Sequence, residues 1–174
     1  SDAGNLKTKA IKDGDFYIVN GTKSFISGGG YSDVYVTMVR TGDDSTAGIS
    51  TLMIEKDSPG ISFGAQEKKM GWNSQPTAQV IFEDCKVPTK NLLGNEGDGF
   101  KIAMKGLDGG RLNIAACSLG TAQSAFERAV EYVGDREQFG KKIQDFQSIQ
   151  FKLADMATEL EASRLMLRSA ATKV

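Results

Sequence analysis

The chain has 174 residues, of which 40% are hydrophobic and 25% charged, a composition typical of a globular protein with one ordinary domain or two small ones. The formal net charge of −1 gives no argument for binding to nucleic acid or to an anionic membrane surface. Histidine is absent, and the two cysteines, Cys85 and Cys117, lack CxxC spacing, which argues against a metal site and against a Ser-His or Cys-His nucleophile.

Residues 1–96 have the pattern of strands and turns. Asp13-Gly14 lies between the runs LKTKAIK and DFYIV and predicts a hairpin. Alternating or β-branched runs follow at 34–40, 48–56 and 78–87, separated by clusters of glycine, aspartate, serine and proline. Short strands at this spacing predict an all-β domain over 1–96, built as a sandwich or barrel-like.

From residue 97 onward the hydrophobic period becomes that of helices. One apolar stripe runs from Ala115 to Val133 and a second from Phe146 to Leu167, mostly in steps of three or four residues. The break between them, GDREQFGKK, predicts a long antiparallel helical hairpin over 97–174, part of a larger helical bundle. The fold class is therefore α+β. The chain starts without methionine and the second stripe has no stop signal, so we expect a piece of a longer protein.

Three consecutive glycines, Gly28 to Gly30, follow the predicted strand that ends in Phe25-Ile26-Ser27. They indicate either a wide loop or bulge, or the close approach of a planar ligand to bare backbone. The stretch matches neither GxGxxG nor a phosphate-binding P-loop, so a dinucleotide fold of the common kind is not supported.

Two further motifs each allow two interpretations. Gly109-Gly110 interrupts the first helical pattern, which indicates tight helix packing or a kink, or else a ligand lying against the helix beside Arg111. Arg136 lies in the break between the helices, as part of a solvated basic turn or as a partner for a phosphate.

Five segments, in this order along the whole chain, resemble the flavin-dependent acyl-CoA dehydrogenases. They are the Ser1-Asp2 start, NGTKSFISGGG, GWNSQPTAQVIFEDCKVP, GGRLNIAACSLG and REQFGKKIQDFQSIQFKLADMA. Each segment alone is a weak signal, and their joint occurrence is a strong one. GWNSQPT and GGRLNIAACSLG are most similar to members that act on isobutyryl-CoA in valine breakdown.

The resemblance implies roles for individual residues. Phe25, Ile26 and Ser27 would contact the isoalloxazine of FAD, with the Ser27 hydroxyl near the hydride-accepting nitrogen and Phe25 where relatives often carry tryptophan. The residues expected to contact the acyl-CoA substrate are Ser1, Asp108, Gly109, Gly110 and Arg111. Arg136 would reach the phosphate of FAD in a neighbouring subunit, with Phe146 and Gln147 making adjoining contacts, which implies a homo-oligomer, specifically a homotetramer.

The reaction implied by the resemblance is α,β-dehydrogenation of a short branched acyl-CoA, with hydride transfer to FAD and an electron-transfer flavoprotein as acceptor. The family's catalytic base is a glutamate, either on a later segment or directly before the arginine of the segment that here reads LDGGR. That second position is Gly110, so we expect no general base in this chain and no activity from it alone. The remaining helical glutamates, Glu127, Glu131, Glu159 and Glu161, have the pattern of a solvated face.

Other readings stay open. The chain could be a non-catalytic binding or assembly module on the same scaffold, or belong to an enzyme for straight-chain or 2-methyl-branched substrates. The expected compartment is the mitochondrial matrix in a eukaryote and the cytoplasm in a bacterium. Nucleic-acid binding is not expected, because the net charge is only −1. Membrane insertion is not expected, because the apolar runs are only a few residues long.

Overall fold

A computed structural model describes residues 2–173, which divide into two compact units, Ser1–Met104 and Lys105–Val174. The first unit contains one mixed sheet of seven strands in the order β5-β6-β2-β1-β3-β4-β7. The strands are β1 (Lys9–Asp13), β2 (Phe16–Ser27), β3 (Val34–Arg40), β4 (Ile49–Glu55), β5 (Ile61–Phe63), β6 (Thr77–Pro88) and β7 (Leu92–Leu93). Neighbouring strands are antiparallel except β1 and β3, which are parallel.

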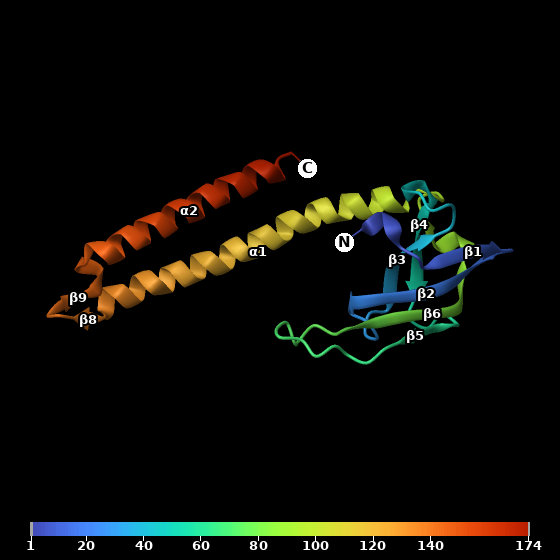
Figure 1. The fold of residues 1–174 in the computed structure, drawn as a ribbon, viewed down its shortest axis with the longest axis horizontal. Helices are drawn as coiled ribbons and strands as arrows, with labels where there is room; N and C mark the ends of the chain where they lie inside the picture. Colours follow the sequence, from blue (N-terminus) through green and yellow to red (C-terminus); the bar gives the residue numbers. More distant parts are fainter. Residues whose placement is uncertain (1, 174) are drawn as a thin grey trace. The chain divides into compact units, whose positions relative to one another are not determined.

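The sheet curls around a single core. In Figure 1, β3 and β4 cross the direction of β2 and β6, and β4 also contacts β6, which is not its neighbour in the sheet. Alternate residues of each strand point inward, as expected when one face of a strand is buried. The core is formed by Ala10, Tyr17, Val19, Tyr35, Val39, Leu52, Ile54, Val80, Phe82, Cys85 and Val87. The predicted hairpin is confirmed, since β1 and β2 pair on either side of a two-residue turn at Gly14 and Asp15.

A buried arginine ties two loops to this sheet, and the sequence analysis did not single it out. Arg40, at the end of β3, is only 6% exposed. Its guanidinium donates to the carbonyl oxygens of Leu6 (3.1 Å), Ser45 (3.0 Å) and Gly4 (2.8 Å), and also to that of Asp43. The segment before β1 and the turn after β3 are thereby joined at one point.

The three consecutive glycines are explained by the β domain itself. Gly28 and Gly30 have φ values of +77° and +81°, which favour glycine. Gly29 is buried, and a Cβ built on it would lie 3.0 Å from both the backbone nitrogen and the backbone oxygen of Ala78. The Tyr35 hydroxyl donates to the Gly28 carbonyl and accepts from the Gly30 amide, both at 3.0 Å. What approaches the bare backbone here is strand β6, so the turn interpretation holds and no ligand is needed to account for the glycines.

Gly29→Ala is expected to lower the free energy of unfolding by about 1–2 kcal/mol, because an added methyl group must displace backbone rather than a flexible side chain. Gly71→Ala is the matched control, since a Cβ there has nothing within 4 Å and no positive φ. Urea unfolding of both variants measures the difference. Equal midpoints for the two variants would contradict the steric argument.

The second unit is a pair of antiparallel helices that lie side by side in Figure 1. Helix α1 (Gly99–Asp135) begins in the first unit, and α2 (Gln147–Ala171) follows after a short connection. This connection contains β8 (Glu137–Gln138), β9 (Lys141–Lys142) and one 3₁₀ turn, η4 (Ile143–Asp145). The predicted α+β class, with a β domain followed by a long helical hairpin, is confirmed. The domain division at residues 96 and 97 stays a prediction.

Two local expectations differ from the structure. Helix α1 runs unbroken through Gly109 and Gly110, so the glycines do not interrupt it. The break between the helices lies later than 134–142, because Gly134 still belongs to α1, the chain reverses at Phe139-Gly140, and α2 begins only at Gln147. Each glycine in a helix interior costs about 1 kcal/mol relative to alanine. The two glycines together are therefore not enough to end a long helix.

Candidate functional site

The end of β2 is bulged at the residues predicted to contact a flavin. Lys23 pairs with Val80 and Ile26 with Ala78, so two residues of β2 oppose one residue of β6. Within the bulge, Phe25 has a φ of +57°, a left-handed conformation that costs an L-residue about 1–2 kcal/mol. Bulges are frequent beside active sites because they re-aim side chains. Such strain in a non-glycine residue is a reason to look for a function here.

At the bulge, the middle one of three adjacent side chains packs against the core and the other two are exposed. Phe25 is 73% exposed, a large apolar ring that covers nothing in the β domain. Ile26 packs against the core and holds the strand end in place. Ser27 is exposed, and its hydroxyl forms no hydrogen bond with any residue of the described part of the chain. An exposed aromatic face beside a free hydroxyl on a rigid strand is a suitable surface for a flat heteroaromatic ring.

A cavity of about 320 Å³ adjoins this strand end. Its walls come from β2, β3 and β6 and from the turn before β3, and are mostly aliphatic or aromatic. The lining residues are Lys23, Ile26, Ser27, Ser32, Val34, Tyr35, Val36, Thr37, Met38, Val80 and Phe82. Lys23 is not among the predicted site residues, although a lysine within an otherwise strand-like run two residues before Phe25 was a visible signal.

Lys23 is the charged residue of this cavity. Burial lowers the pKa of its ammonium group to about 8, because apolar surroundings disfavour the charged form. None of the ion pairs formed by the described residues includes it. The site therefore combines an exposed ring, a free hydroxyl and a weakly basic amine within one bulged strand.

The second group of predicted site residues gathers at the turn between the helices. Arg136 directly follows α1, and its side chain is exposed. The Phe139 and Phe146 rings pack edge to face with centroids 6.3 Å apart, and Lys141 Nζ lies 4.2 Å from the Phe146 ring centre. Gln147 is the first residue of α2. The structure thus brings Arg136, Phe146 and Gln147 to one end of the helical unit, as a cluster with exposed cationic and aromatic groups.

Phe139 is a member of this cluster that the sequence analysis did not select. It is 93% exposed and has a φ of +54°. With Gly140, at a φ of +79°, it forms the two-residue turn between β8 and β9. Both central residues of a type I′ turn need positive φ, which is why Phe139 is strained and Gly140 is not. An exposed aromatic residue at such a position points to a contact outside the two described units.

The predicted substrate segment lies on one stretch of α1. Asp108 Oδ1 and Arg111 Nη1 form an ion pair at 2.7 Å, and both side chains are more than half exposed. A Cβ on Gly109 or Gly110 would meet nothing within 4 Å, so packing among the described residues does not require glycine there. Within the described chain, the glycine pair therefore serves neither tight helix packing nor a kink. The surface of α1 at Gly109 and Gly110 is open. Ser1, the remaining predicted substrate contact, lies outside the described residues.

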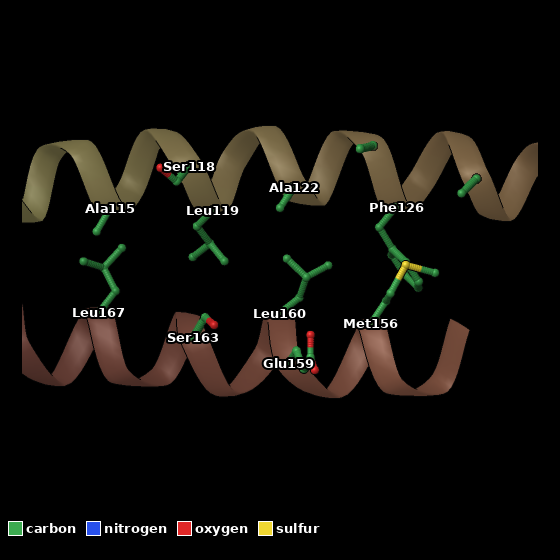
Figure 2. A pocket seen from close by; sticks show the side chains of 12 residues that line it. Ala115, Ser118, Leu119, Ala122, Phe126, Met156, Glu159, Leu160, Ser163 and Leu167 are labelled. Atoms are coloured by element: carbon green, nitrogen blue, oxygen red, sulfur yellow. The ribbon is translucent and has the colours of Figure 1, made fainter. Parts of the chain in front are cut away.

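An apolar groove of about 620 Å³ runs between the helices. Figure 2 shows Leu119 and Phe126 of α1 pointing toward Leu160 and Met156 of α2, with Ala115 near Leu167 at one end. The two stripes read from the sequence therefore face each other. The small alanines at Ala115 and Ala122 leave the groove unfilled.

The helical glutamates occupy ordinary surface positions. Glu127 accepts a hydrogen bond from Gln123 at 2.9 Å, and Glu161 pairs with Arg164 one turn away. Glu131 and Glu159 are exposed as well. Within residues 2–173 no three metal-ligating side chains come together, and no helix is both long and apolar enough to cross a membrane.

Comparison with known proteins gives matches along nearly the whole chain. Residues 1–85 match the family model described as acyl-CoA dehydrogenase, middle domain, and residues 97–174 match acyl-CoA dehydrogenase, C-terminal domain. The mitochondrial isobutyryl-CoA dehydrogenase of Dictyostelium discoideum is 61% identical over 98% of this chain and 41% of its own length. The chain therefore spans less than half of this curated relative.

Two solved structures have the same fold. Butyryl-CoA dehydrogenase from Megasphaera elsdenii superimposes with a TM-score of 0.93 at 46% identity, over 99% of this chain and 45% of that one. A chain from a study of the electron transferring flavoprotein of Acidaminococcus fermentans and of flavin-based electron bifurcation gives a TM-score of 0.91 at 49% identity. It matches 99% of this chain and 46% of that one.

Proposed function

Because the chain belongs to the acyl-CoA dehydrogenase family, we propose that it is part of a flavin-dependent enzyme that dehydrogenates a short branched acyl-CoA. We assign isobutyryl-CoA, an intermediate of valine breakdown, as the substrate. The similarity to the isobutyryl-CoA dehydrogenase of Dictyostelium supports this choice over straight-chain substrates. The observation that carries the flavin assignment is the bulged end of β2, where Phe25 is exposed and the Ser27 hydroxyl is free.

The end of β2 fits one face of an isoalloxazine ring. The exposed Phe25 ring offers a flat apolar surface, and the pairing of β2 with β6 on both sides of the bulge holds its backbone in place. The Ser27 hydroxyl has both a proton to donate and lone pairs to accept with, so it can hydrogen-bond a ring nitrogen. FAD, when bound, supplies the acceptor for the hydride that leaves the β-carbon of the substrate. Ile26, packed against the core, fixes the register of both contacts.

The cluster at the helical turn fits the phosphate-bearing part of FAD. The planar guanidinium of Arg136 can donate two parallel hydrogen bonds to a phosphate group. Phe146 and Gln147 adjoin it and offer an aromatic face and an amide. We assign these contacts to the FAD of a neighbouring subunit, so the proposed assembly is a homotetramer in which each helical unit completes a partner's site.

The open surface of α1 at Asp108, Gly109, Gly110 and Arg111 is the proposed contact for the acyl-CoA, together with Ser1. The absence of side chains at the two glycines lets a ligand lie close to the helix backbone. We assign the general base to none of the glutamates in this chain, since Glu127 and Glu161 are engaged with neighbours on their own helix.

An electron-transfer flavoprotein is the proposed electron acceptor, and the similar chain studied with such a flavoprotein supports it. The proposed location is the mitochondrial matrix for a eukaryotic source and the cytoplasm for a bacterial one, and the mitochondrial Dictyostelium relative supports the first.

The proposed function is tested by mixing the full-length protein anaerobically with a panel of short acyl-CoAs and following flavin absorbance. Isobutyryl-CoA is expected to bleach the flavin fastest. Faster bleaching by butyryl-CoA or a 2-methyl-branched substrate would overturn the substrate assignment. A protein that carries no flavin, or whose flavin responds to none of these substrates, would support a non-catalytic module on the same scaffold instead.

Ser27→Ala is expected to slow flavin reduction about tenfold while leaving substrate affinity nearly unchanged. One hydrogen bond contributes about 0.5–1.5 kcal/mol, and about 1.4 kcal/mol corresponds to tenfold. Stopped-flow reduction with isobutyryl-CoA separates the rate from the affinity. Ser24→Ala, an exposed serine in the same bulge, is the matched control. Equal reduction rates for Ser27→Ala and Ser24→Ala would remove Ser27 from the site.

A further inference from the structure

We propose that Lys23 is a self-acylation site, at which the lysine side chain takes the acyl group from a short acyl-CoA thioester. The proposed function enters this inference only by supplying the acyl donor. The site itself follows from the cavity beside the end of β2.

The cavity places the Lys23 amine where an acyl group can be received. Its volume of about 320 Å³ leaves room for a short branched chain, and its walls include Val34, Val36 and Val80, which suit an aliphatic group. Val34 is 44% and Val36 57% exposed, so no described residue closes the cavity on the β3 side. The thioester can therefore enter with its acyl end first while the CoA part stays outside.

The groups around Lys23 leave its amine without a fixed partner. Strands β3 and β6 contribute no charged side chain to the walls, and the turn before β3 contributes only Ser32. The one other titratable group is Tyr35, whose hydroxyl is engaged with the backbone of Gly28 and Gly30. Burial lowers the pKa of Lys23 to about 8. Near that pH the Lys23 side chain is a neutral amine in about half of the protein molecules. An ordinary lysine has a reference pKa of about 10.4 and is almost fully protonated at the same pH.

The chemistry needs no further reactant. The neutral ε-amine attacks the thioester carbonyl, a C–N bond forms, and the C–S bond breaks. The thiolate of CoA leaves and recovers a proton from the attacking nitrogen, so the products are an amide on Lys23 and free CoA thiol. Nothing is oxidised or reduced. The ammonium group is replaced by a neutral amide that fills the cavity next to Ser27.

The test uses the full-length protein incubated with isobutyryl-CoA between pH 7 and 9, followed by peptide mass spectrometry. Lys23 is expected to be acylated about tenfold faster at pH 8 than Lys12 and Lys86, two exposed lysines of the same β domain. The rate at Lys23 is expected to rise about fivefold from pH 7 to pH 8 and only about twofold from pH 8 to pH 9, following the neutral fraction of an amine with a pKa of about 8. Lys23→Arg removes this product, and its peptides containing Lys12 and Lys86 report whether the variant reacts normally elsewhere.

Acylation of Lys23 no faster than that of Lys12 and Lys86 would overturn the proposal. So would a rate at Lys23 that rises about tenfold between pH 8 and pH 9, because that is the behaviour of an ordinary exposed amine with a pKa of about 10.4. These outcomes are independent of dehydrogenation, since the readout is the mass of a peptide rather than flavin reduction. A protein that fails to bleach with any acyl-CoA can still acylate Lys23, and the reverse also holds.

Discussion

Replacing Arg40 by alanine is expected to lower the free energy of unfolding by about 3–5 kcal/mol, because it leaves several carbonyl oxygens without their donor, at about 1–3 kcal/mol each when such a group is left unpaired. The guanidinium is 6% exposed and donates to the carbonyl oxygens of Gly4, Leu6, Asp43 and Ser45. Truncation leaves these carbonyl groups without their donor and separates the segment before β1 from the turn after β3. Hydrogen bonds to charged groups contribute about 1.5–3 kcal/mol each, though not additively.

Urea unfolding of the 174-residue chain measures this loss. Arg40→Lys is expected to recover only part of it, because an ammonium has three donors and cannot match the fork of the guanidinium. Asp44→Ala is the matched control. Asp44 Oδ1 lies 3.7 Å from Arg40 Nε, but its side chain is fully exposed, so its removal should leave the midpoint close to that of the parent chain. An Arg40→Ala midpoint equal to that of Asp44→Ala would show that the carbonyl contacts do not stabilise the β domain.

Arg136→Ala is expected to weaken FAD binding by about tenfold to hundredfold in the full-length protein. A charge-assisted hydrogen bond contributes about 1.5–3 kcal/mol, and each 1.4 kcal/mol is about tenfold in affinity. The Arg136 side chain is exposed, and no ion pair of the described residues includes it, so nothing in the helical unit competes for its donors. The structure supplies no other role for it, which makes the expected loss specific to the cofactor.

The measurement is the FAD content retained through gel filtration, followed by titration of the apoprotein with FAD. Lys142→Ala removes one positive charge from the same turn and controls for long-range attraction to a phosphate. Equal retention of FAD by the parent and Arg136→Ala would contradict the assignment. Equal losses in Arg136→Ala and Lys142→Ala would replace a specific contact by general electrostatic attraction.

The sequence by itself determined the class of fold and the position of its elements. The Asp13-Gly14 signal placed the first hairpin, because positive φ at a two-residue turn is a local requirement that glycine meets. The stripes through Leu119 and Leu160 placed both helices and the faces that meet in the groove, because a period near 3.6 is a property of the chain alone. The family resemblance also came from sequence, and the matches to the middle and C-terminal domain models confirm it.

The tertiary structure decided what depends on contacts between distant residues. The backbone that lies close to Gly29 is that of Ala78, about fifty residues later in the sequence. The local sequence around Gly29 does not tell whether a distant strand or a ligand lies against it. Arg40 looks like any strand residue in the sequence, yet its donors meet carbonyl oxygens from two separate loops. The weak basicity of Lys23 comes from its burial, and the outward turn of Phe25 comes from a bulge against β6. Local propensity predicts elements because it acts within a few residues, whereas burial, strain and pKa arise from neighbours that only folding brings together.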